Sequence, residues 1–240
     1  MSIKNKQVAF LRNKFYPPDK YIDHDTIFYN WINESLTKDQ KVLDIAAGDG
    51  NIWKYDFKER CKEVIGIDVD KKILSNPNLT TAVLGNFFEN SFKDSSFDIV
   101  FANYFVEHIN DPVVFLKEIQ RILKTGGSVY FRTLNLYYYA GIVSKFTPFA
   151  FHRYYNKKLD RVEHDIWPTF YRLNTTRKIK KLSKKLGLHY EIKMFEGYPG
   201  YLRINPILFL MGVLYERTVN KINVLNDFKG ILMCKLTFYK

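Results

Sequence analysis

The sequence predicts an α/β fold with a doubly wound, mostly parallel sheet, and three short stretches carry this prediction. Residues 41–45, 64–70 and 98–102 are rich in Val, Ile and other apolar residues. Such runs are typical of strands that are buried on both faces. Segments with a helical spacing of apolar residues lie between or beside them. We therefore expect a sheet of seven strands, the last of them antiparallel, flanked by helices.

The first forty residues precede the first strand. Residues 7–16 have the composition of a short basic helix, which Pro17 and Pro18 would end. Residues 25–36 place apolar side chains close to helical spacing, at Ile27, Phe28, Trp31, Ile32 and Leu36. We expect residues 1–40 to form a helical cap on a domain that covers residues 41–240.

The first strand runs into a glycine-rich turn, KVLDIAAGDGNI, at residues 41–52. Asp44 lies in the apolar run, and small residues follow at alternate positions, Ala46, Gly48 and Gly50. Glycine lets a ligand approach the backbone, and a helix after the turn would offer unpaired N–H groups. Trp53 is too large for the last small position of a dinucleotide fingerprint, and the next residues lack the Lys and Ser or Thr of a P-loop.

An acid at a strand end followed by alternating small residues resembles motif I of the class I S-adenosylmethionine-dependent methyltransferases, D/E-x-G-x-G-x-G. Ala46 stands in place of the first glycine. The resemblance implies a Rossmann-like fold, S-adenosylmethionine as cofactor and S-adenosylhomocysteine as product. It places Asp44, Ala46, Gly48 and Gly50 at the cofactor. The alternative for this stretch is an ordinary strand–turn–helix that binds no ligand.

The ends of the next strands supply further candidate cofactor residues. Asp68 lies about twenty residues past the turn, where such folds place an acid on ribose hydroxyls, and Val69 follows it. In the family that the chain resembles, an Asp after a glycine here bonds the adenine amino group. Asn86 follows Gly85 and could accept that hydrogen bond, and Phe87 would supply a backbone N–H and an apolar face.

Polar residues also follow the strand at residues 98–102. Asn103 lies just past its carboxyl end, where ligands of open α/β sheets bind, so we expect Asn103 to face the cofactor and Tyr104 to contact the substrate. Glu107 and His108 are similar to the family's EH pair. His108 is a candidate general base because His titrates near neutral pH, and its alternative role is to cap or orient the loop.

A helix and a fifth strand complete the resemblance. Residues 112–123 have an apolar stripe, with Pro112 in the first turn and glycine at 126–127 expected to end the helix. The fifth strand is expected at residues 128–133. The stretch LKTGG is similar to the family's R-x-L-K-P-G-G, so the ordered resemblance covers about residues 40–133.

Residues 134–172 form an aromatic and basic insertion after the fifth strand, which we expect to be a substrate lid. The pattern TxN…HRxY…PTxYRxNT, from Thr133 to Thr175, resembles methyltransferases of bacterial surface-polysaccharide synthesis. The guanidinium group of Arg can bind a phosphate through two hydrogen bonds, and an aromatic face can stack on a sugar ring. The alternative is that these aromatic residues only pack a helical cap. The candidate substrate-binding residues are Tyr104, Arg153, Tyr154 and Arg172, and the candidate bases are His108, His152, His164 and Asp165.

The remaining chain predicts a helix at residues 175–186, a sixth strand at 188–195 and a seventh at 231–239. A helical insertion is expected between these strands, at residues 197–228. Its apolar run at 206–214 is shorter than the ~20 residues that span a bilayer. Three roles are open for this run, namely contact with a membrane surface, a dimer contact, or burial against the domain.

Composition narrows the classes of function. The net charge of +12 is compatible with nucleic acid, anionic lipid or a phosphorylated substrate. Two distant cysteines indicate a reducing compartment and form no C-x-x-C, and no secretory segment is visible at the N-terminus. We expect a cytoplasmic protein, monomeric or homodimeric, without a metal, for which peripheral contact with the inner membrane surface is open.

These observations predict an enzyme that transfers a methyl group to a small-molecule acceptor. The foremost acceptor is a hydroxyl of a sugar or sugar nucleotide in polysaccharide biosynthesis, phosphorylated or nucleotide-linked. The first alternative is a quinone or another lipid-like acceptor at a membrane. An RNA methyltransferase would use the positive charge, but no RNA-recognition motif is visible, so nucleic acid is disfavoured. A non-catalytic protein of the same fold is the remaining alternative.

Overall fold

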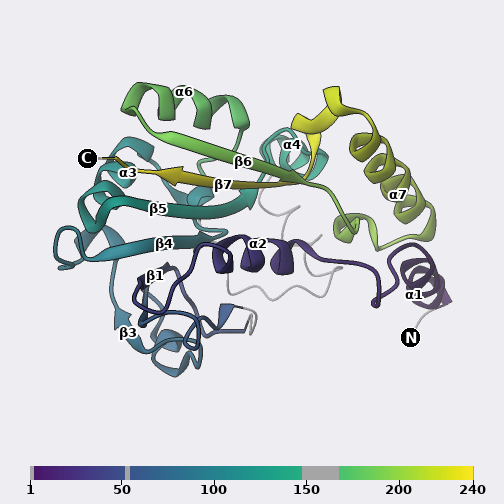
Figure 1. The fold of residues 1–240 in the computed structure, drawn as a ribbon. Helices are drawn as coiled ribbons and strands as arrows, with labels where there is room; N and C mark the ends of the chain where they lie inside the picture. Colours follow the sequence, from purple (N-terminus) through teal and green to yellow (C-terminus); the bar gives the residue numbers. More distant parts are fainter. Residues whose placement is uncertain (1–2, 52–54, 148–167, 240) are drawn as a thin grey trace. The chain divides into compact units, whose positions relative to one another are not determined.

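The computed structural model describes residues 3–51, 55–147 and 168–239 (Figure 1). The chain divides into two compact units. The sheet unit comprises Asp25–Thr133, Thr169–Lys193 and Leu232–Lys240. The helical unit comprises Met1–His24, Leu134–Pro168 and Met194–Ile231.

A seven-stranded sheet with the order β3-β2-β1-β4-β5-β7-β6 forms the centre of the sheet unit, which confirms the predicted fold class (Figure 1). The three apolar runs at residues 41–45, 64–70 and 98–102 fall on strands β1, β2 and β4. The strands are β1 (Lys41–Ile45), β2 (Glu63–Asp68), β3 (Thr81–Leu84), β4 (Phe97–Asn103), β5 (Leu123–Leu134), β6 (His189–Phe195) and β7 (Ile231–Thr237).

The register of the central strands places a ligand-binding crevice beside β1. Val42 of β1 pairs with Val64 of β2 on one side and with Ile99 of β4 on the other, all in parallel. The chain therefore leaves β1 in one direction and returns to β4 on the opposite side. Open α/β sheets bind ligands at the carboxyl ends of strands at such a switch point.

The last strand runs antiparallel to β5, as expected. Gly126 N donates to Phe238 O at 2.8 Å, and Phe238 N donates back to Gly127 O at 3.1 Å. At the next position along both strands, the hydroxyl groups of Ser128 and Thr237 share a hydrogen bond of 2.9 Å. Two residues that exchange hydrogen bonds in this way are typical of an antiparallel ladder.

Helices cover the sheet where the sequence has apolar residues at helical spacing. α2 (His24–Asn33) buries Phe28, Trp31 and Ile32, and the Trp31 ring meets Tyr130 of β5 edge-on at 5.4 Å. α3 (Pro112–Ile122) begins at an Asp111 side chain that accepts two backbone N–H groups. α6 (Thr176–Leu186) begins at Thr175 and ends at Gly187, which has a φ of 66°.

Two local predictions were wrong. The described residues 55–62, between the glycine turn and β2, contain no α-helix, and Tyr55 and Phe57 are both buried although they stand two positions apart. The glycines at 126–127, which were expected to end the helix, lie inside β5 instead, because the helix already ends at Ile122. Leu123 closes α3 through its N–H and already has extended torsions, so it pairs directly with Phe97.

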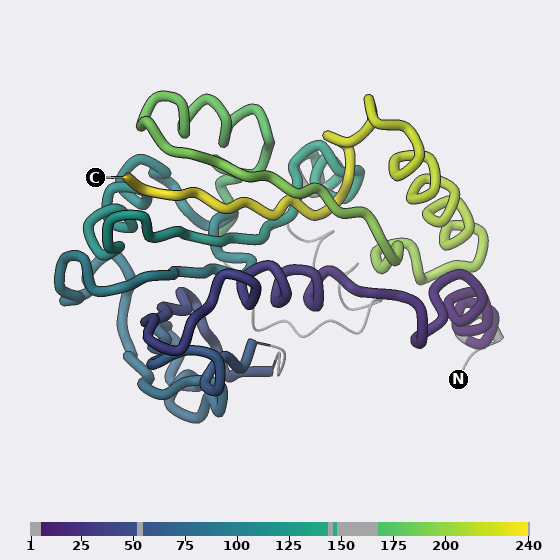
Figure 2. Tube along the Cα trace, in the orientation of Figure 1, coloured from purple at the N-terminus to yellow at the C-terminus, as the bar shows by residue number. Residues whose placement is uncertain are grey.

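The helical unit is built around two packed helices (Figure 2). α1 (Ile3–Phe15) and α7 (Pro206–Lys221) share a small core that includes Val8, Tyr16, Phe209 and Val213. α4 (Tyr139–Phe146), η6 (Gly200–Leu202) and η7 (Asn223–Phe228) complete it. Across the described part of the chain, no helix has both the length and the apolar character needed to cross a bilayer.

Candidate active site

The glycine turn after β1 has left-handed torsions at every second residue. The φ values are 59° at Ala46, 56° at Gly48 and 76° at Gly50. Ala46 stays bonded to the sheet, since its N–H donates to Ile67 O at 2.9 Å. A left-handed torsion at a residue with a Cβ costs roughly 1–2 kcal/mol. The position at which the chain departs from the glycine motif therefore keeps a glycine-like conformation.

Gly48 and Gly50 differ in the space around them. A Cβ added at Gly50 would collide with the Asn76 side chain and lie 2.8 Å from Pro77 Cδ. A Cβ added at Gly48 would meet nothing within 4 Å. The backbone at Gly50 is therefore packed against protein, whereas the backbone at Gly48 faces open space.

Two asparagines that sequence reasoning missed hold this turn. Asn76 Nδ2 donates to Ala47 O at 3.0 Å and to Gly48 O at 3.2 Å. Asn78 Nδ2 donates to Gly50 O at 3.2 Å, and its own N–H donates to Asn76 Oδ1. The signal in the sequence was an Asn-Pro-Asn turn beside the second strand. These side chains satisfy the carbonyl groups that the turn leaves outside the sheet.

A pocket of about 170 Å³ lies at the switch point between β1 and β4. Four predicted cofactor residues line it, namely Asp44, Ala46, Gly50 and Asn103. Tyr55, Asn76 and Asn78 also line it and were not predicted. Ligand sites usually enclose about 300–1,000 Å³, so this pocket alone is too small to enclose a molecule of cofactor size.

Asp44 is a buried acid at the base of this pocket. Burial raises the pKa of its carboxyl group well above the usual value, and the nearby charge of Asp68 raises it further. An ionised carboxylate in such a place is unfavourable until a cation approaches it. The pocket is therefore electrostatically suited to a positively charged ligand.

Asp68 ties the glycine turn to the end of β2. Its Oδ2 accepts the Gly48 N–H at 2.9 Å, and its Oδ1 accepts the Asp70 N–H at 2.8 Å. Each carboxylate oxygen can accept more than one hydrogen bond, so these contacts leave capacity for ligand hydroxyls. Val69, the next residue, is about half exposed.

A buried arginine positions Asn103, and sequence reasoning missed it. Arg132 of β5 is fully buried; its Nε donates to Asn103 Oδ1 at 2.8 Å and its Nη2 donates to Asp25 Oδ1 at 2.6 Å. The guanidinium carbon lies 4.7 Å from the centre of the Tyr104 ring. Tyr104 has a φ of 53° and donates its N–H to Arg132 O. The signal was a charged residue inside an apolar strand, which needs a partner.

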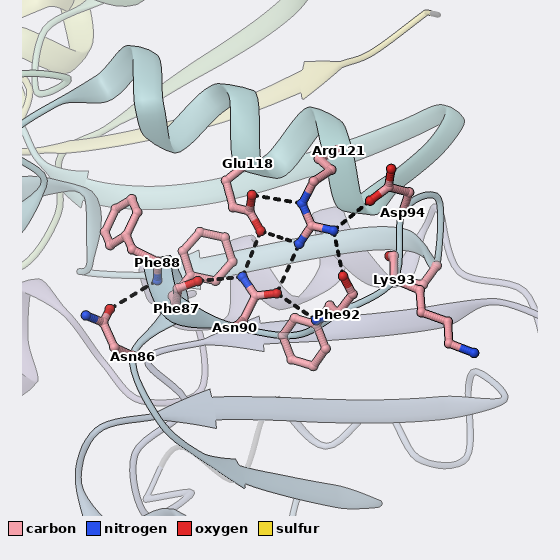
Figure 3. A network of polar contacts seen from close by, with 10 residues as sticks. Asn86, Phe87, Phe88, Asn90, Phe92, Lys93, Asp94, Glu118 and Arg121 are labelled. Atoms are coloured by element: carbon pink, nitrogen blue, oxygen red, sulfur yellow. Dashed lines mark hydrogen bonds and ion pairs between the residues drawn. The ribbon is translucent and has the colours of Figure 1, made fainter.

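The loop that contains Asn86 is pinned to α3 (Figure 3). Asn86 Oδ1 accepts the Phe88 N–H at 3.1 Å. Asn90 Nδ2 donates to Glu118 Oε1 at 2.7 Å, and Arg121 bonds both Glu118 and Asp94. The network fixes the backbone of residues 86–94.

The two rings of this loop differ in exposure. Phe87 is buried, 5.9 Å from the Phe115 ring, whereas Phe88 is 44% exposed. Phe87 therefore offers a ligand its backbone more readily than its ring. The ring available to a ligand in this loop is that of Phe88.

Polar residues of the insertion motif lie in a buried network. Thr133 Oγ1 donates to Glu107 Oε2 at 2.7 Å and accepts from Asn174 Nδ2 at 2.6 Å. The N–H groups of Phe170 and Tyr171 donate to Glu107 O. Burial raises the pKa of Glu107. Glu107, Thr133 and Asn174 thus hold the segment before α6 against the loop after β4.

The remaining candidate residues for catalysis and substrate binding do not line this pocket or lie outside the described residues. His108 lies at the end of η4 (Val106–His108) and does not line the pocket. Arg172 is exposed. His152, Arg153, Tyr154, His164 and Asp165 lie outside the described residues.

The comparisons with known proteins agree with this geometry. Residues 43–131 match the family described as a methyltransferase domain. A demethylmenaquinone methyltransferase of Staphylococcus aureus is 34% identical over 104 residues, which are 39% of this chain and 43% of that protein. A ubiquinone biosynthesis O-methyltransferase of Stutzerimonas stutzeri is 30% identical over 118 residues, 44% of this chain and 50% of that protein.

A solved structure extends the likeness to the fold. The S-adenosylmethionine-dependent methyltransferase of Mesorhizobium loti has a TM-score of 0.56 at 12% identity and covers 89% of this chain and 97% of its own. The chain spans half or less of the curated relatives that it matches. Residues 43–131 are thus similar to a methyltransferase domain, and the strand order is that of the Rossmann-like fold that the sequence predicts.

The two glycines predict a contrast between fold and binding. Gly50→Ala should lower the free energy of unfolding by about 2–3 kcal/mol, because the new methyl group collides with Asn76 and Pro77. Gly48→Ala adds backbone strain without a collision, so it should unfold at a higher temperature than Gly50→Ala and yet weaken ligand binding. Thermal unfolding and calorimetric titration of both variants test this. Equal unfolding temperatures would contradict the packing argument.

The buried acid predicts a dependence on pH. Because the pKa of Asp44 is raised in the fold, a cationic ligand that lowers this pKa should release protons when it binds. The affinity for the ligand should therefore rise with pH above the ordinary carboxyl range of about 4. Asp44→Asn should flatten this profile and weaken binding about tenfold or more. It should also stabilise the ligand-free protein above that pH, because the carboxyl group of Asp44 ionises there in the unfolded chain and so favours unfolding. A ligand affinity that still rises steeply with pH in Asp44→Asn would refute the assignment of this pH dependence to Asp44.

Arg132 predicts a coupled loss. Arg132→Met removes the ion pair with Asp25 and should lower the free energy of unfolding by about 2 kcal/mol. This loss is smaller than that for a fully buried ion pair, because Asp25 is partly exposed to solvent. Arg132→Met combined with Asp25→Asn should recover part of that loss. Chemical denaturation of the wild type, both single variants and the double variant gives the coupling free energy. Simple additivity would mean that the ion pair contributes nothing.

Proposed function

We propose that the protein transfers a methyl group from S-adenosylmethionine to a small-molecule hydroxyl. The observation that carries this proposal is the pocket at the switch point, which brings Asp44, Gly50 and Asn103 together from separate parts of the sequence. The matched methyltransferase domain covers all three residues. Because the chain covers only part of the relatives that it matches, the activity of the whole protein is itself part of this proposal.

The residues present fit this cofactor. S-Adenosylmethionine carries an ammonium and a sulfonium, and the buried Asp44 carboxyl group is the kind of partner that a cation needs. Gly48 faces open space, so the backbone there can be approached closely. Asp68 retains acceptor capacity for ribose hydroxyls, and the loop at Asn86 is held in place for the adenine. When bound, the cofactor supplies a methyl group that is already electrophilic.

The residues of this chain would then mainly bind, orient and exclude water. Arg132 holds Asn103 at the pocket, and the same guanidinium supports Tyr104, so the last residue of β4 and the residue that follows it are rigidly placed. A hydroxyl acceptor also needs a group that accepts its proton. The candidates are His108 within the described residues, and His152, His164 and Asp165 in the insertion.

For the acceptor, we propose a sugar or sugar nucleotide. The support is the motif shared with methyltransferases of surface-polysaccharide synthesis and the basic, aromatic character of residues 134–172, in which Arg153, Tyr154 and Arg172 are candidates for substrate contact. In the structure, Thr133 and Asn174 of this motif are buried and bonded to each other. These two residues would therefore shape the segment instead of touching the acceptor.

A quinol or another lipid-like acceptor is the second candidate. Two matched relatives are named for quinone substrates, one for demethylmenaquinone and one for ubiquinone biosynthesis. Exposed apolar side chains on α7, such as Ile207 and Leu214, are also compatible with work at a lipid surface.

Transfer of labelled methyl from S-adenosylmethionine separates these candidates. The protein is incubated with a panel of nucleotide sugars and with short-chain demethylated quinols, and products are counted. We expect methylated sugar nucleotide in the wild type and at least about a hundredfold less with Gly48→Ala. Turnover of quinols alone would refute the sugar acceptor and retain methyl transfer. No turnover of either class, by protein shown to bind the cofactor, would contradict the proposed reaction.

A further inference from the structure

Helix α7 is apolar on two opposite faces. One face carries Phe209, Gly212, Val213 and Val219, which are buried against the helical unit. The other face carries Ile207, Leu210, Met211 and Leu214, which are 70%, 42%, 60% and 69% exposed. Positions 207, 210, 211 and 214 follow helical spacing, so their side chains form one continuous stripe. Surface helices normally carry polar residues on the side that faces water.

The neighbouring helix α1 continues this apolar surface. Its Phe10 is 67% exposed, and a groove of about 490 Å³ runs between Phe10, Leu11 and Pro206. Pro206 directly precedes Ile207, and the two helices pack side by side through Val8 and Phe209 (Figures 1 and 2). We call the five exposed side chains the α1–α7 face; they are Phe10, Ile207, Leu210, Met211 and Leu214.

The exposed charges of these two helices are all positive. α1 contains no acidic residue, and Lys6, Arg12 and Lys14 are exposed on it. On α7, Arg217 and Lys221 are exposed. The acid of α7, Glu216, is buried, where it accepts hydrogen bonds from Tyr16 and Asn220. An apolar stripe with basic residues beside it is the pattern of a helix that lies in the surface of an anionic bilayer.

We propose that the α1–α7 face docks onto an anionic lipid bilayer. The apolar side chains enter the boundary between headgroups and acyl chains, and the basic residues meet the acidic headgroups. At 16 residues, α7 is too short to span the bilayer, so it lies along the surface. A second copy of the chain is a poorer occupant, because it would bring two positively charged surfaces together. This inference goes beyond the proposed methyl transfer and does not depend on it.

Flotation of the full chain with vesicles tests the proposal. Vesicles of phosphatidylcholine with about one third phosphatidylglycerol are compared with vesicles of phosphatidylcholine alone. We expect the wild type to float with the anionic vesicles and to bind them less as salt is raised. The double variant Ile207→Ser/Leu214→Ser should bind about tenfold less or weaker still. The matched control Leu74→Ser/Val114→Ser, which removes exposed apolar residues of the sheet unit, should bind like the wild type.

Thermal unfolding and cofactor titration of the double variant accompany the flotation. The variant should keep the unfolding temperature of the wild type and the same affinity for S-adenosylmethionine, which separates a lost surface from a lost fold or a lost cofactor site. A wild type that does not float, or a variant that floats equally well, overturns the proposal. A wild-type dimer that the double variant converts to a monomer, without flotation of either, also overturns it and would show that the face is a contact between copies.

Discussion

The hydrogen bond between the Gly48 N–H and the Asp68 carboxylate is the contact on which the candidate site depends. It joins the turn after β1 to the end of β2, two points 20 residues apart in the chain. With Asn76 and Asn78 bonded to the carbonyl groups of the same turn, it holds the left-handed torsions of three alternate residues in place. Regular secondary structure cannot satisfy a backbone of this shape, so side chains from the next crossover must do so. The sheet supplies the position of the turn, and these side chains supply its conformation.

Two features of the site lower the stability of the folded protein. Asp44 is buried beside Asp68, and Ala46 has torsions that favour glycine. Both features oppose folding, and both lie where a cationic ligand would bind. Backbone strain and a buried acid of this kind persist where the surrounding structure is rigid enough to hold them. Here the paired strands β1, β2 and β4, and the buried Arg132 between Asp25 and Asn103, provide that surrounding structure.

Much of the fold followed from the sequence because strands buried on both faces leave uninterrupted apolar runs. The structure of the crossover after the glycine turn did not follow from the sequence, since Tyr55 and Phe57 are buried in the core without a helical period. Asn76 and Arg132 were missed as site residues because their partners, Gly48 and Asn103, lie 28 and 29 residues away. For residues 206–214, the spacing predicted a helix, but a helix that is apolar all round does not reveal which face is buried. The structure shows that the run is split between a buried and an exposed face.

Calorimetric titration of the purified protein with S-adenosylmethionine and S-adenosylhomocysteine tests the central claim most directly. Asp68→Ala is measured beside the wild type, and Asp70→Ala serves as the matched control, since the side chain of this neighbouring acid caps η2 (Lys71–Ser75) and pairs with Lys72. We expect micromolar binding by the wild type and by Asp70→Ala, and loss of this binding in Asp68→Ala. A folded wild type that binds neither molecule, or an Asp68→Ala variant with undiminished affinity, would contradict the central claim.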